Sequence, residues 1–234
     1  ATADGLYDSD AVVMNADFAQ AAQHLIPARL RRKWSDKKIV SRNYSCSTFM
    51  MYLGVKGELS DVQHHTICLA EDLAGNVNDV MTRLQLPQAP SCYVQNASVT
   101  DKTLAPEGHS ALYILVPVPN CNSGIDWPRV APHYRELVLD RLSLIGIGDI
   151  RDRIVYEQVV TPHGWRDDHR IHKGATFNMT HELTQMLYFR PHNRFEDVSG
   201  LYLAGGGTHP GSGLPVIFES ARISSGLISA DLNL

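Results

Sequence analysis

Apolar runs near the two ends of the chain are short and uninterrupted. Residues 11–14 (AVVM) and 201–204 (LYLA) are entirely apolar, a pattern typical of parallel strands that are buried on both faces. A helical pattern over 17–26 follows the first run, and another over 216–231 follows the second. We therefore expect both ends of the chain to join one α/β layer.

The middle of the chain predicts strands with few crossover helices. Strand patterns occupy 45–55, 65–69, 91–99, 110–118 and 154–160, and helical patterns occupy 71–86 and 127–144. Strands in such close succession predict a mixed or antiparallel sheet with the helices on one face. Segment 161–199 has no clear period, but its aromatic residues argue against disorder, so we expect a long functional loop.

Composition and charge narrow the functional classes. The 234 residues are 44% hydrophobic and 20% charged, as in an ordinary soluble globular protein with one large domain or two small ones. A net charge of −4 gives no basic surplus, so a nucleic-acid partner is not expected. The longest apolar stretch, 111–119, is about half a membrane span, so the chain is not expected to cross a bilayer. We expect a cytoplasmic protein, either free or peripheral on a membrane surface.

One basic cluster leaves two interpretations open. It is either a solvated face or a contact for acidic lipid headgroups, and it comprises Arg29, Arg31, Arg32, Lys33, Lys37 and Lys38.

Cysteine and histidine residues give no strong motif. No C-x-x-C pair occurs, which favours reduced, buried thiols in a cytosolic protein at Cys46, Cys68, Cys92 and Cys121. Histidines and aspartates cluster in sequence between residues 163 and 172, without a further metal-ligand motif. We therefore expect surface or loop-bracing roles rather than a metal site. The cluster comprises His163, Asp167, Asp168, His169 and His172.

Segment 205–215, GGGTHPGSGLP, carries the clearest chemical signal. It joins an apolar strand to a helix that opens at Leu214 or Pro215. Strand, glycine loop and helix together present free backbone N–H groups and a positive dipole end to an anion. The segment matches neither G-x-x-x-x-G-K-[ST] nor G-x-G-x-x-G, so the two commonest phosphate loops are excluded here. A purely structural turn and a ligand loop both remain open, and His209 is either a proton carrier or a loop brace.

The sequence around this loop resembles a known family. Residues 200–227, GLYLAGGGTHPGSGLPVIFESARISSGL, are similar to the C-terminal flavin motif of phytoene desaturase-type carotenoid desaturases, which belong to the FAD-dependent amine-oxidase-like flavoproteins. Further blocks resemble the family in the same order: VVMNADF (12–18), HHTICLAEDL (64–73), SVTDKTLAPEGHSALYILVPVP (98–119), IDW (125–127) and YFRPHNR (188–194). The resemblance therefore covers nearly the whole chain.

The resemblance also implies that part of the family pattern is missing. Family members are FAD enzymes of about twice this length, with a G-x-G-x-x-G fingerprint near the N-terminus, and nothing here matches that fingerprint. The chain thus resembles only the C-terminal half, with the missing N-terminal half of the same protein as its implied partner. We expect the chain alone to bind FAD weakly or not at all.

The implied fold class is α/β plus α+β. The C-terminal part of an FAD-binding Rossmann-like domain would be joined to a substrate domain with a mixed or antiparallel sheet and helices on one face. Residues 1–26 would belong to the FAD-binding layer, 27–160 to the substrate domain, 161–199 to an irregular loop region, and 200–234 to the strand, glycine loop and helix that complete the FAD-binding layer.

The family roles transfer to two stretches of the glycine segment. The resemblance implies that the first stretch passes the ribityl and pyrophosphate region of FAD; it comprises Ala204, Gly205, Gly206 and Gly207. The second would direct backbone N–H groups at the N1 and C2 carbonyl edge of the flavin; it comprises Gly213, Leu214, Pro215, Val216 and Ile217. We expect Arg190 and Arg194 to anchor the nearby loop by ion pairs, and no catalytic residue is assigned.

The implied reaction removes two hydrogens from a saturated C–C unit of a long apolar carotenoid precursor and transfers hydride to flavin. Strands within 46–55 and 110–119 would wall an apolar channel, or else are plain core strands. Two alternatives remain: a family relative that isomerises or saturates a carotenoid or retinoid, and a non-catalytic module that binds a lipid or a partner chain.

Overall fold

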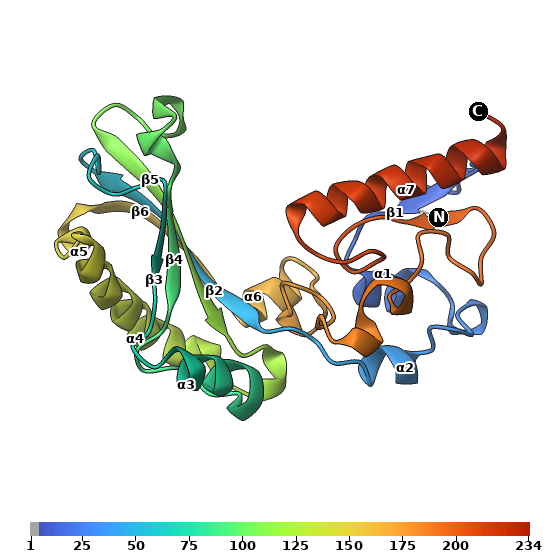
Figure 1. The fold of residues 1–234 in the computed structure, drawn as a ribbon, viewed down its shortest axis with the longest axis horizontal. Coiled ribbons are helices and arrows are strands. Elements are labelled where there is room, and N and C mark those ends of the chain that lie inside the picture. The colour runs from blue at the N-terminus through green and yellow to red at the C-terminus, as the bar shows by residue number, and fades with distance from the viewer. Residues whose placement is uncertain (1–4) are drawn as a thin grey trace. The chain divides into compact units, whose positions relative to one another are not determined.

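A computed structural model describes residues 5–234, which divide into two compact units (Figure 1). The first unit contains the N-terminal segment through Ser45, residues 170–172 and residues 177–234. The second unit contains residues 46–169 and 173–176. Each unit has its own hydrophobic core.

The second unit is built on a five-stranded antiparallel sheet. Its strands are β2 (Ser47–Lys56), β3 (His65–Cys68), β4 (Cys92–Asn96), β5 (His109–Val118) and β6 (Ile154–Val160). Their order is β3-β4-β5-β2-β6, and β2 pairs with β5 along its whole length, from Ser47 opposite Val118 to Lys56 opposite His109. Of the two predicted alternatives, a mixed or an antiparallel sheet, the structure has the antiparallel one.

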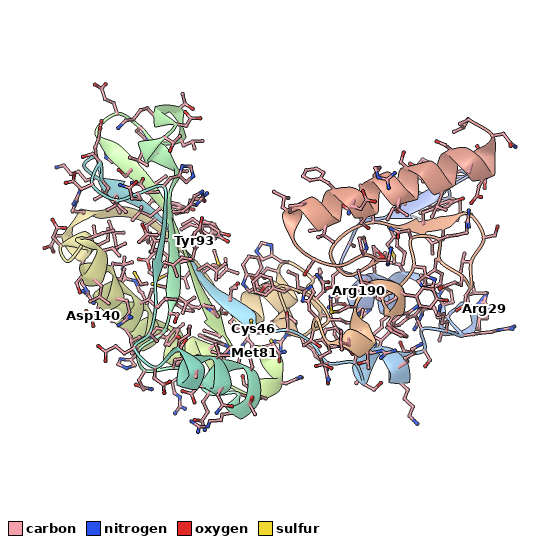
Figure 2. All side chains as sticks on the ribbon, viewed as in Figure 1. Arg29, Cys46, Met81, Tyr93, Asp140 and Arg190 are labelled. Carbon is pink, nitrogen blue, oxygen red and sulfur yellow. The ribbon has the colours of Figure 1, made fainter. Side chains whose placement is uncertain are left out.

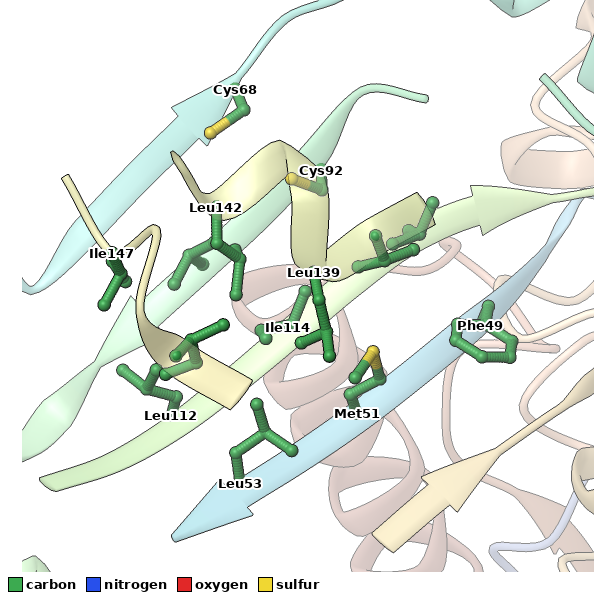
Figure 3. Packing of buried hydrophobic residues seen from close by; sticks show 14 of the residues in the cluster. Phe49, Met51, Leu53, Cys68, Cys92, Leu112, Ile114, Leu139, Leu142 and Ile147 are labelled. Carbon is green, nitrogen blue, oxygen red and sulfur yellow. The ribbon is translucent and has the colours of Figure 1, made fainter. Parts of the chain in front are cut away.

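The core of this unit lies between the sheet and α4 (Trp127–Arg141). Every second residue of β5 is buried, because alternate side chains of a strand point to opposite faces. Figure 3 shows Leu139 of α4 against Ile114 and Met51, and all three side chains are at most 1% exposed. Helices α3 (Leu73–Asn78), α4 and α5 (Ile150–Arg153) lie on the same side of the sheet (Figure 1), as predicted.

One predicted helix is wrong in form. Residues 71–86 do not make a single α-helix: α3 ends at Asn78, a π-helical turn spans Asp79–Arg83, and Leu84 adopts a left-handed conformation with φ 54°. Gly75, Asn76 and Asn78 are weak helix formers, and these residues make up half of α3.

The first unit joins the two ends of the chain. Strand β1 (Val12–Met14) pairs in parallel with β7 (Leu201–Leu203), from Val12 opposite Leu201 to Met14 opposite Leu203. Helices α1 (Phe18–Leu25) and α7 (Leu214–Leu232) follow the two strands, which confirms the shared α/β layer. Strand β7 is buried throughout. Val12 and Val13, however, are about half exposed, so β1 is not buried on both faces as expected.

The boundary between the units lies after Ser45, not after residue 26. Segment 27–45, expected to belong with the sheet, contains α2 (Asp36–Val40) and packs in the first unit. Trp34 meets Phe18 edge to face at 5.1 Å, and both belong to the same core cluster as Ile39. Burial of Trp34 and Ile39, each 1% exposed, therefore ties this segment to α1.

Segment 161–199 is largely irregular, but it contains one α-helix and three short 3-10 helices that the sequence pattern did not predict. Helix α6 (Pro162–Asp167) begins after Thr161, whose side chain accepts a hydrogen bond from the Gly164 amide. Among residues 5–234, no helix combines the length and the apolar character needed to span a bilayer.

Candidate functional site

The glycine segment lies between the end of β7 and the start of α7. Asn15, which follows β1, donates a hydrogen bond from Nδ2 to the Ala204 carbonyl at 2.9 Å. The two parallel strands are thus linked at their carboxyl ends, where the chain enters the loop at Gly205. Ligands of open α/β sheets bind at this end of the strands.

Asn193 fixes α7 against β7. Its Nδ2 lies 3.2 Å from the Leu203 carbonyl, 3.0 Å from Ser220 Oγ and 3.1 Å from Ser224 Oγ. The Ser224 hydroxyl donates a further bond to the Leu203 carbonyl. Ser220 and Ser224 are at most 2% exposed, so the helix packs on the strand through small hydroxyl side chains. Sequence reasoning missed Asn193 because its partners lie 10 to 31 residues away.

The N-terminus of α7 has open backbone donors. Its N-cap, Gly213, makes no side-chain capping bond, and Pro215 has no N–H group. Within residues 5–234, no group accepts a hydrogen bond from the Leu214 or Val216 amide. A Cβ added at Gly213 would meet nothing within 4 Å. The positive end of a 19-residue helix therefore faces open space.

The glycines at the other end of the segment are explained by packing. A Cβ at Gly207 would lie 2.9 Å from Asn178 Oδ1 and 3.1 Å from Phe18 Cβ, and one at Gly206 would lie 3.3 Å from Ser212 Cβ. A side chain at either position would therefore require these neighbours to shift. The two stretches thus differ: positions 206 and 207 are tightly packed within the unit, whereas the space beside Gly213 is open.

The predicted ion pairs are found for Arg194 but not for Arg190. Arg194 does form an ion pair, with Asp231 at 2.7 Å, and this bond together with one from Tyr202 lowers the pKa of Asp231. Arg190 forms none. It is 1% exposed and donates to the Met179 carbonyl at 2.8 Å and the Gly206 carbonyl at 3.3 Å (Figure 2). Burial lowers the pKa of Arg190, and its role is to brace the loop through carbonyl groups.

His181 is a further residue beside the loop that the sequence did not single out. Its Nε2 lies 2.8 Å from Ser212 Oγ. Burial and the nearby Arg190 charge lower the pKa of His181, which favours neutral imidazole. The segment around His181 has no period and no motif, so only the folded contact identifies it.

His209 lies on a separate cavity of about 380 Å³, lined by Tyr188, His192, Asn193, Arg194, Glu196, His209 and Leu227. Its Nδ1 is buried with no hydrogen-bond partner in the described part of the chain. That cavity includes none of residues 211–217, so His209 is not placed with the helix start, and both of its predicted roles stay open.

The histidines and aspartates of the 163–172 cluster contact different neighbours and do not converge on one point. Asp167 pairs with Arg166 in α6, the His169 ring lies 4.7 Å from Trp165, and the His172 ring lies 4.7 Å from Tyr44. No group of three potential metal ligands occurs among residues 5–234.

The four cysteines are free thiols. Cys68 and Cys92 are buried and lie opposite each other on β3 and β4, whereas Cys46 and Cys121 are only partly buried. Burial, reinforced by Cys68, raises the pKa of Cys92 to about 12. The prediction of buried thiols thus holds for two of the four.

The sheet face opposite the core is rich in tyrosine and lacks charge over its centre. Tyr52 and Tyr113 lie opposite each other on β2 and β5 with ring centroids 5.5 Å apart, and Tyr93 on β4 lies 6.1 Å from Tyr113. All three are half-buried. Between residues 48–54 and 111–117, the positions on this face are Thr48, Met50, Tyr52, Gly54, Ala111, Tyr113, Leu115 and Pro117. An antiparallel sheet facing water is normally polar on its outer face, so this face suits an apolar ligand.

Comparison with known proteins finds curated relatives that are desaturases. It is 51% identical over 221 residues to a 4,4'-diapophytoene desaturase (4,4'-diapolycopene-forming) from Methylomonas sp, covering 94% of this chain and 43% of that protein. It is 41% identical to an all-trans-zeta-carotene desaturase from Myxococcus xanthus, covering 96% and 43%. The chain therefore spans less than half the length of the curated relatives it matches.

A solved structure gives a likeness in fold. The crystal structure of an oxidoreductase from Methanosarcina mazei matches 95% of this chain and 44% of its own with a TM-score of 0.56, at 15% identity. No family model matches the chain. Identity of 41–51% over nearly the whole chain nevertheless settles its relationship. The chain belongs to the family of phytoene and diapophytoene desaturases and corresponds to the C-terminal half of its members.

Proposed function

We propose that the chain is the C-terminal portion of an FAD-dependent carotenoid desaturase that removes hydrogen from CH–CH bonds of a long polyene precursor. The observation that carries this proposal is the 51% identity to a diapophytoene desaturase across 94% of the chain. The open helix start beside the β7 loop supports it independently. Because the chain spans only 43% of that relative, the activity would belong to a longer polypeptide.

The residues of the glycine segment fit the flavin. When bound, FAD would supply the hydride acceptor. The amides of Leu214 and Val216 have no partner among residues 5–234, and they would stabilise negative charge on the ring without reorganising. Gly213 leaves the approach open. Ala204, Gly205, Gly206 and Gly207 would pass the ribityl and pyrophosphate region, held in shape by Asn15, Arg190 and Asn178.

The tyrosine face of the second unit would hold the substrate. A polyene precursor offers no polar handle, so its orientation must come from apolar surface and shape. Tyr52, Tyr93 and Tyr113 provide aromatic area without charge. We assign no acid or base to the reaction.

A missing N-terminal portion would complete the first unit. Strand β1 pairs only with β7 among the described strands, and Val12 and Val13 are about half exposed. Parallel sheets of two strands are rarely stable alone. We propose that a strand of the missing portion adds beside β1 and brings the remainder of the FAD site with it.

A chimera tests the proposal. This chain would replace the corresponding portion of the Methylomonas relative, and the purified chimera would be assayed for bound flavin and for conversion of diapophytoene to conjugated products by absorption. We expect stoichiometric FAD and a coloured product. A folded, flavin-loaded chimera that leaves its substrate unchanged would refute desaturation, and one that takes up no flavin would refute the site.

A matched pair of variants isolates the helix start within the chimera. Leu214 is 68% exposed at the first position of α7. In Leu214→Asp a carboxylate stabilises the helix by about 0.3–1 kcal/mol but opposes negative charge on the ligand, and Leu214→Asn adds no charge. We expect Leu214→Asp to lose flavin on gel filtration while its unfolding temperature is maintained. Equal flavin content in both variants would count against the assignment.

A further inference from the structure

A row of outward-facing side chains crosses the sheet of the second unit. Each strand contributes one residue, and the strand registers give the order His65, Gln95, Tyr113, Tyr52 and Gln158. Tyr93 lies in the next row, opposite Ile67 of β3. Toward β3, the aromatic part of the tyrosine face therefore ends at polar side chains from two strands.

Tyr93 and His65 form a hydrogen-bonded pair at this end of the face. Tyr93 lies between the buried Cys92 and Val94, so its ring points away from the core (Figure 2). His65 Nδ1 lies 2.6 Å from Tyr93 Oη, and the two rings are stacked with centroids 5.9 Å apart. Because Tyr93 also contacts Tyr113, the pair directly adjoins the aromatic row.

The pair keeps a hydrogen-bond donor free. A tyrosine and a histidine carry at least two polar hydrogens between them, and the bond that joins them uses one. Among residues 5–234, neither side chain makes another hydrogen bond. Whichever group donates within the pair, at least one N–H or O–H group is left for a ligand that accepts hydrogen bonds.

Neighbouring side chains hold His65 in place. The His64 ring lies 4.3 Å from the His65 ring. Gln95 donates from Nε2 to His64 Nε2 at 3.4 Å, so His64 Nδ1 carries the hydrogen and donates it to Thr100 Oγ1 at 2.7 Å. Both nitrogens of His64 are thus used. This support reduces the entropy that the pair would lose on binding a ligand.

The edge strand beside the pair is uncharged. Strand β3 is at one edge of the sheet. Exposed edge strands commonly carry charged side chains, above all lysine, but β3 has none. Apart from His65, its exposed side chain is Ile67, at 66%. A hydrogen-bond donor beside uncharged apolar surface suits a mainly apolar ligand that ends in oxygen.

We propose that the tyrosine face accepts a polyene that carries oxygen at one end, as a hydroxyl or carbonyl group. The polyene would lie across Tyr52 and Tyr113, and its terminal oxygen would accept a hydrogen bond from the pair of His65 and Tyr93. This inference rests on the proposed function, because it uses the same face. It specifies the substrate class further: oxygenated polyenes would be bound, and not hydrocarbons alone.

Retinol binding tests the proposal. All-trans-retinol and axerophthene have the same polyene skeleton and differ by a terminal hydroxyl group. Each would be titrated into the 234-residue chain and followed by quenching of tryptophan fluorescence. H65F/Y93F removes both donors but keeps two rings, so retinol should bind about 3- to 10-fold more weakly. Axerophthene should bind within about twofold of its affinity for the unaltered chain, because its contacts are only apolar.

Two further variants locate the effect. Q158M removes the polar group at the opposite end of the row and should leave both affinities within about twofold of those of the unaltered chain. Y52A/Y113A removes aromatic surface and should weaken both ligands alike, by about tenfold. Circular dichroism and unfolding temperature would verify that all variants fold.

The outcomes separate this inference from the proposed function. Unchanged retinol binding by H65F/Y93F, or equal losses for the two ligands, would overturn the inference and leave the tyrosine face as a hydrocarbon site. An equal loss of retinol affinity in Q158M would overturn it as well. If neither ligand binds, or if Y52A/Y113A binds both as tightly as the unaltered chain, the tyrosine face is not the polyene site. The inference then fails together with that part of the proposed function.

Discussion

Replacement of Asn193 by alanine should lower the urea concentration at which the first unit unfolds. Asn193 is 3% exposed, and its Nδ2 lies within 3.2 Å of four acceptors on Leu203, Ser220 and Ser224. The amide has two hydrogens and can make two full bonds, each with a net value of about 0.5–1.5 kcal/mol. The expected loss is therefore about 2 kcal/mol, which at a typical urea dependence corresponds to a midpoint shift of about 1 M.

Trp34 reports this transition. It is 1% exposed in the first unit, whereas Trp127 and Trp165 belong to the second. In a W127F/W165F background, urea titrations of Trp34 fluorescence would compare N193A with N122A, which alters an exposed asparagine of the second unit.

Asn193→Asp makes the test more severe. It keeps the shape of the side chain but places a buried carboxylate beside the Leu203 and Ser220 carbonyl oxygens, so it should cost more than N193A at neutral pH. A midpoint for N193A within about 0.3 M of N122A, or an Asp variant as stable as the parent, would refute the role of Asn193.

Three further predictions concern single sites. Burial raises the pKa of Asp17, which caps α1. Stability should therefore fall as pH rises from the ordinary carboxyl pKa to the raised one, and urea titrations should show D17N gaining on the parent over that range. D17A should be about 1 kcal/mol less stable than D17N, because only asparagine keeps the cap. An advantage of D17N that does not change with pH would contradict this reasoning. Because the pKa of Cys92 is about 12, iodoacetamide should label Cys92 only after unfolding, and fast labelling of the native chain by mass spectrometry would be the contrary result. Gly207→Ala should cost about 1–3 kcal/mol in thermal unfolding through its contacts with Asn178 and Phe18; an unchanged midpoint would show that the loop has room.

Periodicity predicted the regular elements well where the local pattern agreed with the tertiary contacts. Strand β6 spans Ile154–Val160 in both the prediction and the structure. The short apolar runs at the two ends pair in parallel, as their composition indicated. The helix predicted over 71–86 is interrupted after Asn78, in keeping with the weak helix propensity of Gly75, Asn76 and Asn78.

The sequence predicted which segment forms the candidate site, but not which distant residues contact that segment. Glycine and proline content singled out residues 205–215 and predicted a helix start at Leu214 or Pro215, and the helix begins at Leu214. The residues that brace the loop are set by contacts between distant segments: Arg190 reaches Gly206, and Asn15 reaches Ala204 across 189 positions. No local pattern encodes such contacts. The same holds for segment 27–45, which the burial of Trp34 attaches to the first unit.

Flavin stoichiometry tests the central claim most directly. The claim is that this chain holds one part of an FAD site and that the missing N-terminal portion supplies the rest. The 234-residue chain would be dialysed against FAD alone and then together with the separately purified N-terminal portion of the Methylomonas relative. We predict little or no retained flavin in the first case and one flavin per complex in the second. Stoichiometric flavin on the chain alone, or none on a complex that does form, would contradict the claim.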